Sequence, residues 1–258
     1  MALKIGMFDS GIGGLSTLKN LLCQRADLEI YYWADDAYAP YGSKSEAEVR
    51  GRCHAICQHF IHQGIGLIVI ACNTATALAI DELRAHYPEI TFVGVEPYVN
   101  VVNHLPWQAQ QRAVILTTPL TGQSARFSRL KRQLDPAGRL DQYSCPQLAK
   151  IVEHAFWQGD PQLAEKIQEE LAPLQDQHYT YAILGCTHYP LVGRYIAATL
   201  KTEVISTCSA VSKRVLDLLD LAPCNPPDTP ISFWFTRSSQ DTGYAVKTLS
   251  AQAPWPAL

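Results

Sequence analysis

Two cysteines of this sequence occupy matching settings in which a thiol can do chemistry. Cys72 follows the apolar run 67–71, and Cys186 follows the apolar run 181–185. Each run predicts a short strand buried on both faces, with a helical segment after the cysteine. Open α/β sheets bind ligands where a parallel strand ends and a helix begins, and the helix dipole favours a thiolate there. One such cysteine would be interpreted as structural, but two indicate a pair of thiols that act together.

The strands at the start of each half of the chain also correspond. One apolar run ends at Asp9 and Ser10, and another ends at Thr117 and Thr118. The offsets from these runs to the cysteines are similar, so the chain divides into two related halves. The predicted fold class is therefore α/β, with two pseudo-symmetric lobes, mostly parallel central sheets and an active site in the crevice between the lobes.

The predicted domain boundaries follow from this repeat. Residues 1–96 and 208–258 form the first lobe, which carries Cys72, and residues 97–207 form the second lobe, which carries Cys186. The last part of the chain is thus expected to return to the first lobe.

The glycine-rich segment 9–14 precedes a helix that begins near Leu15. Alone it resembles a loose phosphate-binding loop, but it lacks the spacing of the dinucleotide and P-loop patterns. Backbone amides at such a turn bind any small anion, including a carboxylate. Nucleotide binding is therefore not expected.

The next long helix carries two further cysteines. Ser43 and Glu46 have capping-box spacing and predict where it begins. Cys53 and Cys57 share its apolar face and are expected in the core, whereas His54 lies on another face. No cysteine pair has the spacing of a zinc finger or ribbon, so no metal site is expected.

Composition narrows the class of protein. The chain has 258 residues, 47% of them hydrophobic, and a formal charge of −3 without a basic stripe, which argues against nucleic acid as a partner. No apolar run approaches the roughly 20 residues that span a bilayer, so no membrane partner is expected. The first strand begins directly after the N-terminus, which leaves no room for a signal peptide, and the eight cysteines are spread along the chain. We expect a cytoplasmic protein with reduced thiols.

Together these motifs resemble the glutamate racemases of the aspartate/glutamate racemase family. The matching segments span most of the chain, in the family's order. They are 8–15, Asp35 with 40–42, 71–75, 94–97, Thr118 with Thr121, 145–153 and 184–190. Aspartate racemases share the two-cysteine plan but usually carry a different glycine-rich opening, so glutamate is favoured as the substrate.

The resemblance implies inversion at the α-carbon of L- or D-glutamate without cofactor or metal, supplying D-glutamate for peptidoglycan. Cys72 would act on D-glutamate and Cys186 on L-glutamate, from opposite faces. Asp9 and Glu153 would assist near the cysteine pair, and His188 would assist Cys186. The positions that match substrate-holding residues are Asp9, Ser10, Asp35, Pro40, Tyr41, Gly42, Asn73, Thr74, Thr118, Thr121, Thr187 and His188.

The sequence departs from the family pattern at two places. Asp36 stands where Thr is common, and Ser206-Thr207 replaces a frequent Asp-Ser pair. Neither change touches the motifs above. The oligomeric state is left open, with a homodimer as one option.

Racemisation explains why two thiols are useful. One fixed base removes the α-proton from one face while a second group returns a proton to the other, so one thiol must be ionised and its partner protonated. A thiol with the ordinary pKa of about 8.5 is only a few per cent ionised at neutral pH. Asp9 and His188 could poise the two thiols. Backbone amides and four hydroxyls could stabilise charge that develops on the substrate carboxylate; these hydroxyls belong to Ser10, Thr74, Thr118 and Thr187.

Two other interpretations remain open from the residues alone. A binding module could clamp an amino acid between its lobes without turnover, which explains the hydroxyl-rich loops but not the paired thiols. Thiol redox chemistry would need the cysteines close enough to bridge, yet neither lies in a Cys-x-x-Cys motif.

Overall fold

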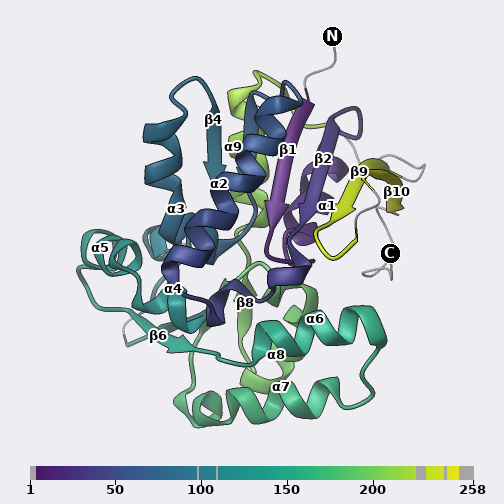
Figure 1. Ribbon diagram of the computed structural model, residues 1–258. Helices are drawn as coiled ribbons and strands as arrows, with labels where there is room; N and C mark the ends of the chain where they lie inside the picture. Colours follow the sequence, from purple (N-terminus) through teal and green to yellow (C-terminus); the bar gives the residue numbers. More distant parts are fainter. Residues whose placement is uncertain (1–3, 98, 109, 225–230, 241–242, 250–258) are drawn as a thin grey trace.

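The computed structural model describes residues 4–97, 99–108, 110–224, 231–240 and 243–249. These residues form two α/β lobes, one above the other in Figure 1. The first lobe is built on a six-stranded sheet. Its strands, in spatial order, are β10 (Ala245–Leu249), β9 (Ile231–Arg237), β2 (Glu29–Ala34), β1 (Lys4–Asp9), β3 (Leu67–Ile70) and β4 (Thr91–Gly94).

The second lobe is built on a four-stranded sheet whose described strands are all parallel. Its order is β6 (Leu140–Ser144), β5 (Ala113–Thr117), β7 (Tyr181–Gly185) and β8 (Glu203–Ile205). The order β2-β1-β3-β4 of the first sheet thus recurs as β6-β5-β7-β8. Among the described strand pairs of the first sheet, only β9–β10 is antiparallel. This arrangement confirms the predicted fold class of two similar lobes with mostly parallel sheets.

Helices cover both faces of each sheet, so the central strands are buried on both sides. On the first sheet, α1 (Leu15–Gln24) and α9 (Cys208–Leu218) cover one face, and α2 (Glu46–His62) and α3 (Asn73–His86) cover the other. On the second sheet, α6 (Leu148–Gln158), α7 (Leu163–Leu171) and α8 (Gly193–Leu200) cover one face. The other face carries α5 (Ala125–Leu134), which follows the short α4 (Pro119–Gln123). Five 3₁₀ turns complete the described elements: η1 (Asp36–Tyr38), η2 (Tyr41–Ser43), η3 (Val99–Asn103), η4 (Ala172–Gln177) and η5 (Tyr189–Val192).

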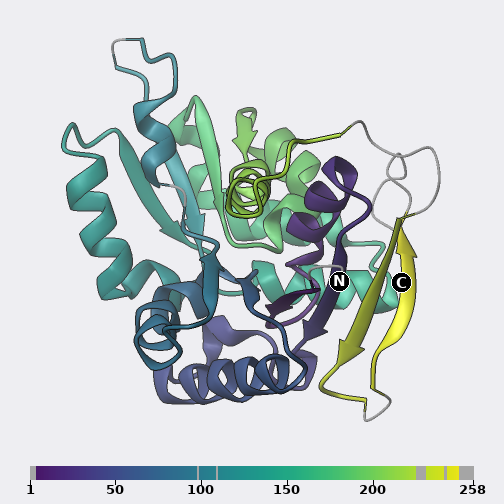
Figure 2. The same ribbon diagram turned by 90° about the horizontal axis from the view of Figure 1, so that it is seen from above.

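After β8 the chain goes back to the first lobe. Helix α9 packs beside α1, and the β9–β10 hairpin extends the first sheet along the edge of β2, where Figure 2 shows it in yellow. Parts of the predicted segment 208–258, namely 225–230, 241–242 and 250–258, lie outside the described residues. The domain boundaries themselves stay a prediction.

Several local expectations can be compared with the structure. Cys53 and Cys57 are buried in the core, as expected. Helix α2 begins later than predicted: its capping box pairs Ser45 with Glu48. Strand β6 was not predicted because its sequence Leu-Asp-Gln-Tyr-Ser is polar, and β8 has only three residues. Both strands form because β5 and β7 supply paired partners.

Within the described residues, no helix is both long enough and apolar enough to cross a bilayer.

Candidate active site

The two cysteines lie where parallel strands of the two lobes end. Cys72 comes just after β3 at the N-cap of α3, and Cys186 directly follows β7. Their residues are only 4% and 6% exposed. Burial raises the pKa of the Cys72 thiol, and the charges of Asp9 and Cys186 raise it further. The backbone N–H groups of Ala75 and Ser10 act in the opposite direction.

Cys186 is the first member of a thiol–imidazole–carboxylate series. Its Sγ lies 3.8 Å from Nδ1 of His188, and Nε2 of His188 lies 2.7 Å from Oε2 of Glu153. Burial tends to lower the pKa of His188, but Cys186 and Glu153 outweigh it and hold that pKa well above its ordinary value. Burial tends to raise the pKa of Glu153, but hydrogen bonds from His188 and the Ile12 N–H hold it below the ordinary value. The imidazole can therefore accept the proton of the thiol while the carboxylate stays charged.

Asp9 lies between the two thiol sites. It is fully buried at the end of β1, where Oδ2 accepts a hydrogen bond from the Gly11 N–H at 3.2 Å. Its Oδ1 accepts from the Thr187 hydroxyl, also at 3.2 Å. Burial raises the pKa of Asp9, with His188 opposing and Glu153 adding to the rise. A carboxyl with a raised pKa beside Cys72 can exchange a proton with that thiol.

The glycine-rich turn is explained by the close approach of the second lobe. A Cβ on Gly11 would lie 2.4 Å from Oε2 of Glu153, and one on Gly13 would lie 2.4 Å from Nδ1 of His188. The Ile12 N–H at this turn donates to Oε2 of Glu153 at 3.1 Å. The turn binds a carboxylate, as its amides allow, and that carboxylate belongs to the protein's own second lobe.

A cluster of hydroxyls crosses between the lobes beside Cys72. Oγ1 of Thr74 lies 3.0 Å from Oγ1 of both Thr118 and Thr121, which are 2.9 Å apart. Gly42 packs closely here, since a Cβ on it would lie 2.8 Å from Cβ of Thr118. All three threonines are buried. They form a compact polar wall that can orient the charged groups of a small substrate.

Asn73 offers a free acceptor in the same region. Its Nδ2 donates to the Val95 carbonyl at 3.0 Å, while the buried Oδ1 has no hydrogen-bond partner among the described residues. A buried polar atom without a partner is costly, and a ligand group that donates to it would remove that cost. Ser10 is buried as well, with its Oγ 4.0 Å from Sγ of Cys72.

The hydrogen bonds of Asp35 go to residues of the first lobe, and its role in substrate binding stays a prediction. Its two oxygens accept from Arg52 at 2.7 and 2.9 Å, and the Tyr41 hydroxyl donates to Oδ2 at 2.5 Å. These bonds fix the turn η2, where Pro40 is the N-cap and Gly42 contacts Thr118. The observed contacts of Asp35 and Tyr41 thus support the loop rather than point at the cysteines.

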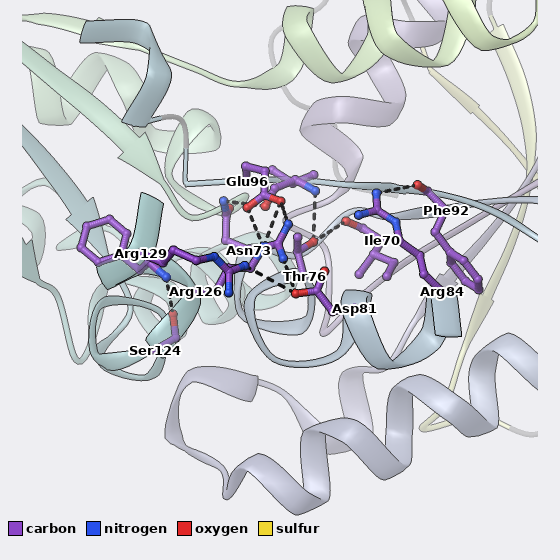
Figure 3. A network of polar contacts seen from close by, with 12 residues as sticks. Ile70, Asn73, Thr76, Asp81, Arg84, Phe92, Glu96, Ser124, Arg126 and Arg129 are labelled. Carbon is purple, nitrogen blue, oxygen red and sulfur yellow. Dashed lines mark hydrogen bonds and ion pairs between the residues drawn. The ribbon is translucent and has the colours of Figure 1, made fainter. Parts of the chain in front are cut away.

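Two features of the site were not predicted. Figure 3 shows the first, in which Arg126 of α5 lies between Glu96 and Asp81 of the first lobe. Arg126 binds Glu96 at 2.5 Å and Asp81 at 2.7 Å, which ties the lobes together near Asn73. The second is Trp157, whose Nε1 donates to Oε1 of Glu153 at 2.9 Å. Its spacing of four residues from Glu153 on one helix could have indicated this pair.

Among the residues that the structure describes, no group of three or more His, Cys, Asp or Glu side chains is placed to hold a metal ion.

This fold and site define a class of α/β proteins in which two similar lobes bury a pair of thiols between them. Comparison with known proteins identifies the family. A family model described as Asp/Glu/Hydantoin racemase matches residues 16–215. The chain belongs to this family.

Relatives and solved structures agree with this assignment. The chain is 37% identical to glutamate racemase of Pseudomonas aeruginosa, over 89% of this chain and 87% of the relative. The Escherichia coli glutamate racemase structure, in complex with L-glutamate and the activator UDP-MurNAc-Ala, superposes with a TM-score of 0.79. It is 25% identical and covers 91% of this chain and 89% of its own. The Francisella tularensis glutamate racemase structure in complex with D-glutamate gives a TM-score of 0.76 at 28% identity, covering 93% and 90% of the two chains.

Proposed function

We propose that this protein is a glutamate racemase that interconverts L- and D-glutamate with Cys72 and Cys186 as its two acid–base groups. The observation that carries the proposal is the placement of the two buried thiols at corresponding strand ends of two similar lobes, each beside its own proton-accepting group. Relatives with the same fold over about nine-tenths of the chain carry that name.

In the direction from L- to D-glutamate, Cys186 removes the α-proton. Before this step its thiol proton passes to Nδ1 of His188, and the charged Glu153 at Nε2 stabilises the imidazolium that forms. The Cys72 thiol then gives a proton to the opposite face. Asp9, whose pKa is raised by burial, returns a proton to Cys72 afterwards. In the reverse direction the two thiols exchange roles.

The carbanion formed between these steps needs stabilisation. We assign the substrate carboxylate to donors near the strand ends, among them the hydroxyls of Thr74, Thr118 and Thr187. The free Oδ1 of Asn73 is suited to the ammonium group, since it is an acceptor without a partner among the described residues. Burial strengthens each of these interactions because little water competes with them.

Polarimetry tests the proposal. Protein dialysed against EDTA, with a reducing agent present, is expected to bring a solution of L-glutamate to zero rotation with no cofactor added. L-Aspartate in a parallel cuvette should lose its rotation far more slowly. An unchanged glutamate rotation would favour a binding module, and loss of activity in EDTA that zinc restores would contradict the mechanism.

Three wider expectations from the sequence remain proposals. The D-glutamate would supply peptidoglycan synthesis, which depletion of the protein in a growing cell would test through D-glutamate auxotrophy. Cell fractionation would test the cytoplasmic location, and light scattering would test the homodimer.

A further inference from the structure

A series of side chains connects the Glu153 carboxylate to the first lobe, at the turn that follows β2. The Trp157 indole donates to Oε1 of Glu153, and the Arg237 guanidinium lies 3.9 Å from the centre of the Trp157 ring. Nε of Arg237 donates in turn to Oδ2 of Asp36 at 2.7 Å. The series starts on α6 in the second lobe and ends on η1 in the first lobe.

We propose, given the racemase activity proposed above, that Trp157 is a positioning residue that fixes the Glu153 carboxylate for the Cys186 side of the reaction. Arg237 and Asp36 hold the indole in place from the other lobe.

The hydrogen bonds of Glu153 show why the indole matters. Oε2 accepts from both His188 and the Ile12 N–H, whereas Oε1 accepts from Trp157 alone among the bonds in the described structure. Without the indole N–H, Oε1 would lose the donor that fixes the plane of the carboxylate. A shift of Glu153 would move His188, whose Nδ1 faces Cys186. Misplacement of such a group by about 1 Å can cost about 100-fold in rate.

Asp36 and Arg237 of the first lobe support the Trp157 indole through several contacts. The Asp36 side chain is 6% exposed and also accepts from the Ser239 N–H at 2.9 Å, so it anchors the turn after β9. The Arg237 side chain is 23% exposed and covers the indole face. A cation over an aromatic ring is attracted by the ring quadrupole, more strongly when the pair is partly removed from water. Asp36 is one of the two departures from the family pattern, and this contact gives it a structural role.

The charged and titratable groups around Glu153 show which of the two thiols the loss of the indole N–H would affect. His188 is bonded to it, Asp9 on β1 and Tyr32 on β2 feel its charge, and Arg237 on β9 lies beyond the indole. Among the hydrogen bonds of Glu153 in the described residues, only the one to His188 leads on to a thiol, and that thiol is Cys186. Removal of the indole N–H should therefore impair the reaction at one face of the substrate.

Racemisation rates cannot reveal this asymmetry, because the equilibrium constant between enantiomers is one and kcat/KM must be equal in both directions. A glutamate analogue with a leaving group on the β-carbon can reveal it. One base takes the α-proton, and the leaving group departs with its bonding electron pair to form the alkene. This elimination needs a base on one face and no acid on the other.

The experiment compares Trp157→Phe, which keeps a ring under Arg237 but removes the N–H, with the matched control Trp234→Phe. Trp234 lies on β9, is 36% exposed and stacks on Tyr31. We expect Trp157→Phe to lower elimination about 10-fold for the one enantiomer that Cys186→Ala cannot process, and less than twofold for the other. Asp36→Asn should show the same preference with a smaller loss, and Trp234→Phe should show none.

A pH profile gives a second readout. The indole N–H favours the charged form of Glu153, so removing the indole should raise the pKa of that carboxyl. In the elimination through Cys186, the acid limb of the pH profile should therefore move to higher pH, and the alkaline limb should stay in place. Equal losses for both enantiomers in Trp157→Phe, or no loss, would overturn the positioning role. Failure of the unmodified protein to racemise glutamate would contradict the proposed function itself.

Discussion

Nε2 of His188 lies 2.7 Å from Oε2 of Glu153, while Nδ1 of the same ring lies 3.8 Å from Sγ of Cys186. The ring thus connects a thiol to a carboxylate, and that carboxylate is also bound by the Ile12 N–H of the first lobe. Cys72 has a different setting, with Asp9 beside it and the first turn of α3 behind it. The two thiols are therefore placed symmetrically by the fold but poised by different groups.

The first prediction assigns a face to each thiol. Cys72→Ala should keep elimination from the L-configured analogue, through Cys186, and lose it from the D form. Cys186→Ala should do the reverse, and both variants should lose more than about 100-fold in racemisation, since each lacks one of the two acid–base groups. Comparable elimination from both enantiomers in either variant would show that the assignment is wrong.

The second prediction concerns the pH dependence of stability. The pKa of His188 is raised on folding, so its contribution is complete below about pH 6.5 and is lost as the pH rises through the folded value. The pKa of Glu153 is lowered, so its contribution is present above about pH 4.3 and is lost as the pH falls through the folded value. Chemical denaturation should show Glu153→Gln to be about 2 kcal/mol less stable than the unmodified protein near pH 5.5, and this difference should shrink as the pH rises through the folded pKa of His188.

A matched control for this experiment is His154→Gln, because His154 is the exposed neighbour of Glu153 on α6. Its unfolding free energy near pH 5.5 should differ from that of the unmodified protein by less than about 0.5 kcal/mol. A Glu153→Gln difference that grew steadily toward pH 9 would contradict the ion pair.

The third prediction tests whether the glycine-rich segment needs glycine because the second lobe approaches its backbone closely. Gly11→Ala and Gly13→Ala would each place a Cβ 2.4 Å from Glu153 or His188, so we expect activity to fall about 100-fold. Gly51→Ala is the control, since nothing lies within 4 Å of its Cβ and it lies within α2. That variant should be about 0.5–1 kcal/mol more stable with unchanged activity. Normal kinetics in both site variants would refute the packing explanation.

The fourth prediction concerns Asp35, which the sequence assigned to substrate binding. Asp35 is fully buried and the Arg52 side chain is 25% exposed, so Asp35→Ala leaves a charge and the Tyr41 hydroxyl without their partner. We expect a loss of about 2–3 kcal/mol in unfolding free energy, at the low end for a broken buried pair because Arg52 reaches solvent. At a temperature where the variant is folded, KM for glutamate should change less than threefold. A large rise in KM without loss of stability would restore the substrate-binding role.

The fifth prediction tests the ion pairs between the lobes that Figure 3 shows. Arg126→Met should lower the unfolding free energy by about 1 kcal/mol, and added salt should reduce the difference. Arg129→Met is the control, since Arg129 is 3.6 Å from Asp81 and 49% exposed. It should change stability by less than about 0.5 kcal/mol. Equal effects of the two substitutions would show that Arg126 does not tie the lobes together.

The sequence by itself determined the elements that carry the chemistry. The apolar runs before Cys72 and Cys186 are short and bounded by glycine or polar residues, so hydrophobic patterning was enough to place both thiols at strand ends. The recurrence of the pattern predicted two similar lobes. The burial of both strands on both faces favoured parallel sheets with helices on each side. Strand β6 could not be predicted in this way, since its residues are polar and its position depends on pairing with β5.

Only the tertiary structure decided which polar groups meet. The resemblance placed Asp35 among the substrate-holding residues, which stays a prediction, and the structure adds that its oxygens accept from Arg52, 17 residues away, and from Tyr41. From the sequence, the amides of the glycine-rich turn were expected to suit a small anion. In the structure the Ile12 N–H binds the carboxylate of Glu153, which is 141 residues away along the chain. Trp157, Arg237 and Asp36 lie on three elements from two lobes, and no periodicity connects them. Hydrophobic pattern is a local property of the chain, whereas hydrogen bonds and ion pairs depend on how the lobes are packed together.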